Sequence, residues 1–257
     1  QLDATLAEGL IAGTVQARVR ITATPPIPFA SALHGLLDYP YGCAEQTASK
    51  GYAALALDPE TAARLGVPGL APAQRRARLE GAFGRLAAMQ TASGHFSLWG
   101  GDDGAEPALT PYVADFLLDA REAGFAVPEA VLQKALDRLS EDLLAGGPQF
   151  YGQEHREHLR FANRAHAGYV LARVNRAPLG TLRALYDQEK ASSLTGLPLV
   201  QLGLALALQG DARRGAAAIA DGFARDPEKR PAWLGDYGSR IRDDALMIAL
   251  LHERGRA

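Results

Sequence analysis

The chain has 257 residues, of which 47% are hydrophobic and 22% are charged, an ordinary composition for a globular protein with one well-filled core or two small domains. Its formal net charge of −2 argues against a nucleic-acid partner. No apolar run approaches the ~20 residues of a spanning helix, so we expect no direct membrane insertion. The single cysteine excludes an internal disulfide. Because the first residue is Gln rather than Met, we expect a piece of a longer protein whose targeting signal lies elsewhere.

The first thirty residues differ in pattern from the rest. Residues 15–22 alternate apolar and polar side chains, as a half-buried strand does, and Pro25, Pro26 and Pro28 then break the pattern. We therefore predict an extended or β segment over 1–30, which could form the edge of a neighbouring domain, followed by a helical domain over 31–257.

Everything after the prolines has the 3–4 residue spacing of apolar side chains that is typical of helices. The predicted helices are 43–57, 73–92, 111–124, 129–145, 157–175, 179–190, 197–209, 212–225 and 240–254. With no second convincing strand, the fold class is all-α. So many helices bury their faces better as antiparallel pairs in a ring or a solenoid than in a simple bundle, and periodicity does not choose between the two.

The cysteine lies at the predicted start of the first of these helices. Cys43 precedes Gln46 by three residues, a spacing that brings two side chains together on one helical turn. The unpaired amides and dipole of a helix N-terminus favour the thiolate. A thiolate placed there can attack the Gln46 carboxamide, expel ammonia and close a thioester. The product would be a stored acyl group that reacts once.

The residues around this pair match a known family. Gly42-Cys43-Ala44-Glu45-Gln46 resembles the thioester motif of the alpha-2-macroglobulin and complement family, and the longer stretch 39–47 is similar to the bacterial alpha-2-macroglobulins. The segments 89–101 and 235–246 are also similar to stretches that follow the thioester in those proteins.

The resemblance implies an α/α toroid with the thioester near one end. It also implies a single-use protease inhibitor rather than an enzyme, in which a lysine of a trapped protease attacks Gln46 and is acylated. We further expect contacts with neighbouring domains of a parent macroglobulin, a periplasmic location with a parent that could be anchored in the inner membrane, and no cofactor or metal.

Four residues of the motif have supporting roles to consider. Tyr39 and Tyr41 could exclude water from the thioester, Tyr39 being the better candidate by resemblance, although two core tyrosines beside a proline turn explain them equally well. We expect Gly42 to provide a tight chain reversal. Glu45 could orient the ring or relay a proton, or could simply stabilise the first turn of the helix.

Residues outside the motif are weaker candidates. By resemblance, Trp99 forms a wall near the motif together with Phe96 and Gln90, although core packing is the simpler interpretation of both aromatics. In some complement-type members a histidine redirects the thioester toward hydroxyls, but His155, His158 and His166 cannot be aligned to that role. The spacing of His155 and His158 could also suit a metal, but without a third ligand a solvated turn is the simpler interpretation.

Three other functions compete with the thioester. A cysteine-dependent hydrolase would use Cys43 with a histidine base, but it does not need a glutamine at this spacing. An α/α-barrel glycosidase would use paired carboxylates among Asp102, Asp103 and Glu106, which lie too close together to flank one bond well. A non-covalent helical-toroid binding module needs none of this chemistry.

Overall fold

The computed structural model describes residues 11, 29–40, 42–65, 67–101 and 104–254. The predicted strand at 15–22 lies outside these ranges. The helices are α1 (Phe29–Leu37), α2 (Ala44–Ala56), α3 (Pro59–Leu65), α4 (Pro72–Met89), α5 (Leu109–Glu122), α6 (Glu129–Leu144), α7 (Arg156–Arg173), α8 (Leu179–Glu189), α9 (Leu197–Leu208), α10 (Ala212–Phe223) and α11 (Arg240–Arg254). Within the described ranges, β-type pairing is limited to two isolated bridges, Gln90–Phe96 and Ser97–Ala105.

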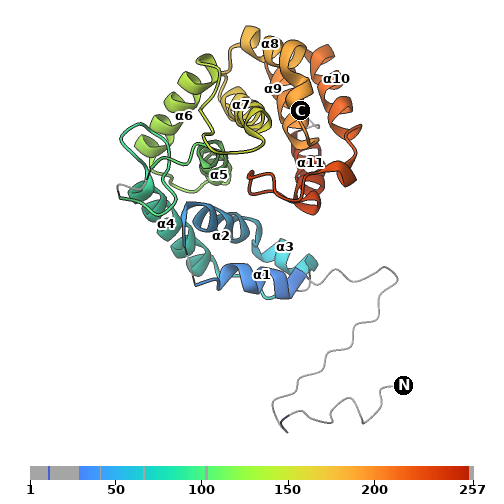
Figure 1. The fold of residues 1–257 in the computed structure, drawn as a ribbon. Helices are drawn as coiled ribbons and strands as arrows, with labels where there is room; N and C mark the ends of the chain where they lie inside the picture. The colour runs from blue at the N-terminus through green and yellow to red at the C-terminus, as the bar shows by residue number, and fades with distance from the viewer. Residues whose placement is uncertain (1–10, 12–28, 41, 66, 102–103, 255–257) are drawn as a thin grey trace, which may run out of the picture.

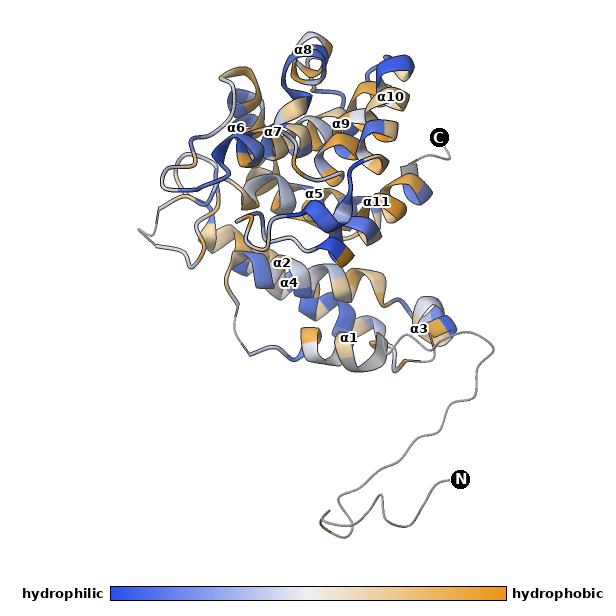
Figure 2. Cartoon of the chain, turned by 45° about the vertical axis from the view of Figure 1, so that its right-hand side comes forward, coloured by the Kyte–Doolittle hydropathy of each residue, from blue (hydrophilic) through white to orange (hydrophobic). Residues whose placement is uncertain are grey.

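The helices form an all-α toroid in which inner and outer helices alternate along the chain (Figure 1). The inner helices α2, α5, α7, α9 and α11 contact one another in that order, and α4, α6, α8 and α10 pack outside them. Hydrophilic residues gather on the outer helices α6, α8 and α10 (Figure 2). The fold expected from the family resemblance is therefore confirmed.

The inner helix α9 is buried on nearly every side, which explains why its sequence is apolar throughout rather than amphipathic. It approaches α10 closely because glycines face each other at the contact. A Cβ built on Gly203 would lie 2.7 Å from the Gly215 carbonyl oxygen, and one built on Gly196 would lie 2.4 Å from the Gly222 carbonyl oxygen. No larger residue fits at either place without moving backbone.

Every segment predicted to be helical contains a helix, and the ends agree within a few residues. Asp211 is the N-cap of α10 as its sequence suggests, and its side chain accepts a hydrogen bond from the Arg214 amide. The helices α1 and α3 were not predicted. At seven residues, α3 is too short to show a period, and a cap at Asp58, whose carboxylate accepts from the Glu60 and Thr61 amides, starts it.

Helix α2 packs between α4 and α5 and carries the motif at its N-terminus. Gly51 of α2 makes room for the fully buried ring of Phe116 on α5, since a Cβ at Gly51 would lie 2.3 Å from the ring atom Cζ. Tyr52 and Phe83 pack on the same ring, with centroid distances of 5.1 and 5.8 Å. This aromatic contact fixes α2, and with it the start of the helix where the motif lies.

Candidate functional site

Cys43 and Gln46 share the first turn of α2, as the sequence predicts. Cys43 is the N-cap residue and is 5% exposed, and Gln46 is the third helical residue and is half-buried. The Cys43 backbone N–H donates to Gln46 Oε1 at 3.1 Å. This bond holds the carboxamide over the helix start and polarises its carbonyl toward attack by a nucleophile.

The carbonyl of Gly42, one residue before the cysteine, is held by two donors. Arg85 Nε lies 2.8 Å away and the buried Thr47 hydroxyl 3.2 Å away. A Cβ on Gly42 would lie 2.9 Å from Arg85 Cζ. Gly42 is not among the described residues with positive φ. The Arg85 guanidinium therefore lies directly against Gly42, and the tight chain reversal that we expected at this glycine stays a prediction.

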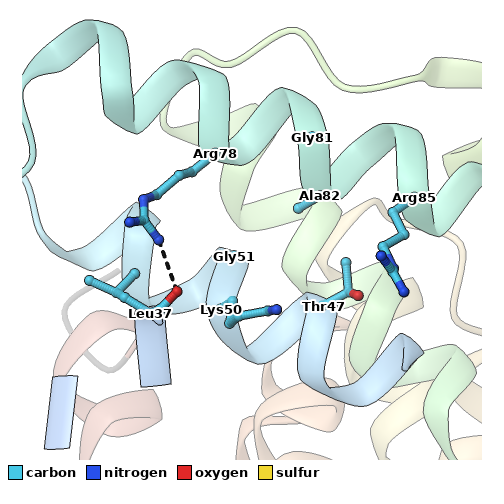
Figure 3. Close-up of a pocket in the computed structure, with 8 residues that line it drawn as sticks. All are labelled: Leu37, Thr47, Lys50, Gly51, Arg78, Gly81, Ala82 and Arg85. Atoms are coloured by element: carbon cyan, nitrogen blue, oxygen red, sulfur yellow. Dashed lines mark hydrogen bonds between the residues drawn. The ribbon is translucent and has the colours of Figure 1, made fainter. Parts of the chain in front are cut away.

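Two more cations hold the segment that leads to the motif. Arg78 Nη1 donates to the Leu37 carbonyl at 2.9 Å, and Lys50 Nζ donates to the Tyr39 carbonyl at 3.1 Å. Figure 3 shows Arg78 and Arg85 reaching from α4 toward α2, with Lys50 between them. We call Lys50, Arg78 and Arg85 the basic clasp. They border a pocket of about 210 Å³, lined also by Leu37, Thr47, Gly51, Gly81 and Ala82.

Of the aromatic residues predicted to support the motif, Tyr39 and Trp99 are exposed at the surface. Tyr39 is 43% exposed, with its carbonyl in the basic clasp, and Tyr41 lies outside the described residues. Trp99 is 56% exposed on a turn that touches the motif, because the Ala44 amide donates to the Leu98 carbonyl at 2.8 Å. Trp99 therefore lies at the surface beside the motif.

The other two predicted wall residues lie further inside. Phe96 is fully buried and belongs to the hydrophobic core. Gln90 donates to the carbonyls of Gly94 and Val131, so it braces the turn after α4 against α6. Neither residue is described as touching the motif. Both hold in place the turn after α4, whose Leu98 carbonyl accepts from the Ala44 amide of the motif.

Glu45, between the cysteine and the glutamine, is part of a hydrogen-bonded chain. Ser49 Oγ donates to Glu45 Oε1 at 2.7 Å and lies 2.9 Å from the hydroxyl of Tyr112 on α5. Burial raises the pKa of the Tyr112 phenol, so this hydroxyl keeps its proton. The carboxylate is thus attached to the neighbouring helix as well as to its own.

Sequence reasoning did not place Tyr237 near the motif, and it considered Glu106 only as a glycosidase carboxylate. The Tyr237 phenol is hydrogen-bonded to the Glu106 carboxyl. Its pKa is raised to about 12, chiefly by burial and then by the nearby Glu106 carboxylate. Burial also raises the pKa of Glu106. The loop before α11 therefore contacts Glu106 before α5 and lies near the start of α2.

Tyr237 owes its position to a strained turn. It is one of two described non-glycine residues with positive φ, at 56°. Its neighbour Asp236 accepts from the Gly238 amide and from Arg230, which also binds Asp243 at 2.7 Å. The stretch 235–246 carried a sequence signal through its resemblance to the family, but nothing in it indicated contact with Glu106.

Three histidines have polar partners outside the motif, and none of these partners is Cys43 or Gln46. His95 contacts Thr110 and Asp142, and His166 contacts Asp115. His158 Nδ1 accepts from the Leu194 amide at 3.1 Å, and burial lowers the pKa of its ring to about 4. Within the described ranges, no group of three or more His, Cys, Asp and Glu side chains is arranged to hold a metal ion.

Of the three carboxylates considered for a glycosidase, the structure describes one. Asp102 and Asp103 lie outside the described residues, and Glu106 is hydrogen-bonded to the phenol of Tyr237.

None of the helices in the described part of the chain is both long and apolar enough to cross a membrane.

Comparison with known proteins places this geometry in a family. No protein-family model matches the chain. It is 62% identical to the alpha-2-macroglobulin of Xylella fastidiosa strain Temecula1 over 255 residues, which cover 99% of this chain and 16% of that protein. The chain belongs to the bacterial alpha-2-macroglobulin family.

Solved alpha-2-macroglobulin structures have the same fold. The Salmonella protein reacted with methylamine superposes with a TM-score of 0.83 at 39% identity, covering 90% of this chain and 15% of that one. The trypsin-activated protein of Escherichia coli superposes with a TM-score of 0.77 at 40% identity, covering 85% of this chain and 15% of that one. The chain thus spans about a sixth of the length of its alpha-2-macroglobulin relatives.

Proposed function

We propose that this chain is the covalent-capture domain of a protease-trapping macroglobulin, and that Cys43 and Gln46 form its thioester. The observation that carries the proposal is the geometry of the first turn of α2, where the Cys43 N–H lies 3.1 Å from Gln46 Oε1. One backbone amide thus orients the acyl group toward the residue that bears the thiol.

Ring closure follows from this arrangement. The Cys43 sulfur attacks Gln46 Cδ, the carbonyl electrons move onto Oε1, and the Cys43 N–H stabilises the charge that develops there. The tetrahedral adduct then collapses and expels the carboxamide nitrogen, which takes up the thiol proton and leaves as ammonia. The same N–H remains on the acyl oxygen and activates the thioester for its later reaction.

Capture repeats the chemistry with an amine. A lysine amine of a trapped protease attacks the Gln46 carbonyl carbon, and the carbon–sulfur bond breaks. The products are an amide that joins the protease to Gln46 and a free thiol on Cys43, so each molecule acts once. Two relatives support this route: the Salmonella protein has been reacted with methylamine, and the Escherichia coli protein has been activated by trypsin.

The surroundings fit a stored electrophile, because hydrolysis by water is its main competing reaction. Cys43 is 5% exposed, and the segment that carries Tyr39 is held by the basic clasp. We propose that Tyr39 and Trp99, both at the surface beside the motif, limit the access of water. We extend the proposal to a periplasmic parent protein whose other domains contact this one.

The proposal is tested with trypsin and the full protein that carries this chain. We expect a covalent adduct on a denaturing gel, and peptide mapping should find a trypsin lysine joined to Gln46. Trypsin with dimethylated lysines should give no adduct, and neither should Cys43→Ala or Gln46→Ala. An adduct that persists in Gln46→Ala, or inhibition of trypsin without any adduct, would overturn the proposal in favour of another linkage or a non-covalent binding module.

A further inference from the structure

The peptide group that joins Gly42 to Cys43 has hydrogen bonds at both of its ends. Its oxygen accepts from Arg85 Nε at 2.8 Å and from the buried Thr47 hydroxyl at 3.2 Å. Figure 3 shows these two side chains at the same end of the contact between α4 and α2. Its N–H, which belongs to Cys43, donates to Gln46 Oε1 at 3.1 Å. One planar peptide group thus lies between the two donors and the acyl oxygen of the proposed thioester.

Hydrogen bonds at the two ends of a peptide group strengthen each other. The peptide bond has partial double-bond character, so donors on its oxygen draw electrons away from its nitrogen and make the N–H a stronger donor. A charged donor such as a guanidinium makes a hydrogen bond roughly twice as strong as a neutral one. The Arg85 guanidinium and the Thr47 hydroxyl therefore both strengthen the bond from Cys43 to Gln46, and Arg85 does so more.

The peptide group on the other side of Cys43 is also held at both ends. The Cys43 carbonyl accepts from the Thr47 amide at 2.8 Å, and the Ala44 amide donates to the Leu98 carbonyl at 2.8 Å. The backbone of Cys43 is thus fixed on both sides, with φ −65° and ψ 173°. Its N–H stays directed at Gln46 while the acyl oxygen gains charge, and a donor that is preorganised in this way needs no rearrangement during the reaction.

We propose that Arg85 and Thr47 are positioning residues that act on the thioester through the Gly42–Cys43 peptide group, and that they set how fast an amine attacks Gln46. The inference rests on the proposed thioester function. It deepens that function by giving Arg85, a residue of α4, control over the reactivity of an acyl group on α2.

The step balances without a further reactant. The neutral amine adds to Gln46 Cδ, and an electron pair of the carbonyl moves onto Oε1, toward the Cys43 N–H. The carbonyl then re-forms, the carbon–sulfur bond breaks with its electron pair on the sulfur, and one proton passes from the nitrogen to the sulfur. One amine and one thioester give one amide and one thiol. The strengthened N–H acts while the oxygen holds the charge.

The test measures the rate of methylamine attack in the full protein, after intact mass has shown that each variant holds the thioester. One donor to such an oxygen contributes about 10²–10³-fold to a rate, and neighbouring hydrogen bonds change one another's strength by about 10–30%. Together these values give a loss of about two- to eightfold. We expect Arg85→Met at the upper end, because its donor is charged, and Thr47→Val at the lower end. Arg85→Lys and Thr47→Ser keep a donor and should restore most of the rate.

The direction of the change separates this role from a structural one. A residue that only closes the motif would, when removed, admit the amine and raise the rate. Arg78→Met is the matched comparison, because Arg78 also lies on α4 and also donates to a backbone carbonyl, that of Leu37 rather than that of Gly42. Its rate should be equal to or above that of the wild type. Arg76→Met removes the same charge from an exposed position on α4 and should leave the rate unchanged.

A spectroscopic readout follows the acyl oxygen itself. Methylamine converts the thioester into an amide, so the infrared difference before and after the reaction contains the thioester carbonyl band, which labelling of glutamine with carbon-13 identifies. A weaker hydrogen bond on the oxygen raises the frequency of this band. The band should move to higher frequency in Arg85→Met and Thr47→Val, and it should stay in place in Arg78→Met and Arg76→Met.

The inference requires both the slower attack and the shifted band. If the thioester is intact and Arg85→Met and Thr47→Val react at the wild-type rate or faster, or if the band does not move, the inference is wrong and the proposed function stands. If Arg85→Met does not close the ring, Thr47→Val decides, because it keeps Arg85. A wild-type protein without a thioester overturns the proposed function and this inference with it.

Discussion

The contact between Gly51 and Phe116 predicts an unusual response to a small substitution. In an exposed helix, replacing glycine by alanine stabilises by about 1 kcal/mol. At Gly51 the added Cβ would lie 2.3 Å from Phe116 Cζ, and the ring cannot yield because it is fully buried against Tyr52 and Phe83. Overpacking of this kind costs about 1–3 kcal/mol, and the severity of the clash favours the upper end. The net expectation for Gly51→Ala is a loss of about 2 kcal/mol.

The assay is urea unfolding of wild type and Gly51→Ala, with thermal unfolding as a second readout. For a chain of this size the loss corresponds to a midpoint lower by roughly 4–8 °C. Gly84→Ala is the matched control, because Gly84 is also inside a helix, α4, but has nothing within 4 Å of its Cβ position. It should be more stable than the wild type. A Gly51→Ala protein as stable as Gly84→Ala would refute the packing of α2 on α5.

Three further changes test other parts of the structure. Thr47→Val removes a buried hydroxyl from the Gly42 carbonyl and should lower the free energy of unfolding by about 1 kcal/mol in urea. Gly203→Ala should destabilise more than Gly51→Ala, because its Cβ would meet the backbone oxygen of Gly215 at 2.7 Å and backbone yields less readily than a ring. The pKa of His158 is lowered from 6.5 to about 4, so the unfolded chain binds more protons between these values. The neutral, buried His158 therefore contributes up to about 3 kcal/mol to the free energy of unfolding above pH 6.5, and this contribution is lost as the pH falls toward 4. In His158→Gln, the free energy of unfolding should depend less steeply on pH over this range.

Much of the fold was predictable because long amphipathic helices leave a periodic signal. The segment that became α6 has apolar residues at helical spacing, and its helix is where that pattern places it. The helix α3 leaves no such signal because seven residues make barely two turns. Periodicity did not distinguish a ring from a solenoid, because it shows which face of each helix is apolar and not which helix that face packs against.

The residues of the candidate site also fall into those that sequence spacing predicts and those that only tertiary packing brings together. Cys43 and Gln46 were predictable because both lie on one helical turn, so the sequence spacing fixes their geometry. Tyr112 and Tyr237 were not, because tertiary packing alone brings them to the motif from α5 and from the loop before α11. The contact of Gly42 with Arg85 was not predictable for the same reason, because Arg85 comes from another helix.

The central claim is that Cys43 and Gln46 close a thioester, and intact mass tests it most directly. Native full protein carrying this chain should weigh less than its sequence by one ammonia, and Cys43 should not react with a thiol reagent. Methylamine should then add one methylamine to the mass, place it on Gln46 and expose one thiol. A protein of full sequence mass, with a Cys43 that is alkylated before any amine is added, would contradict the account.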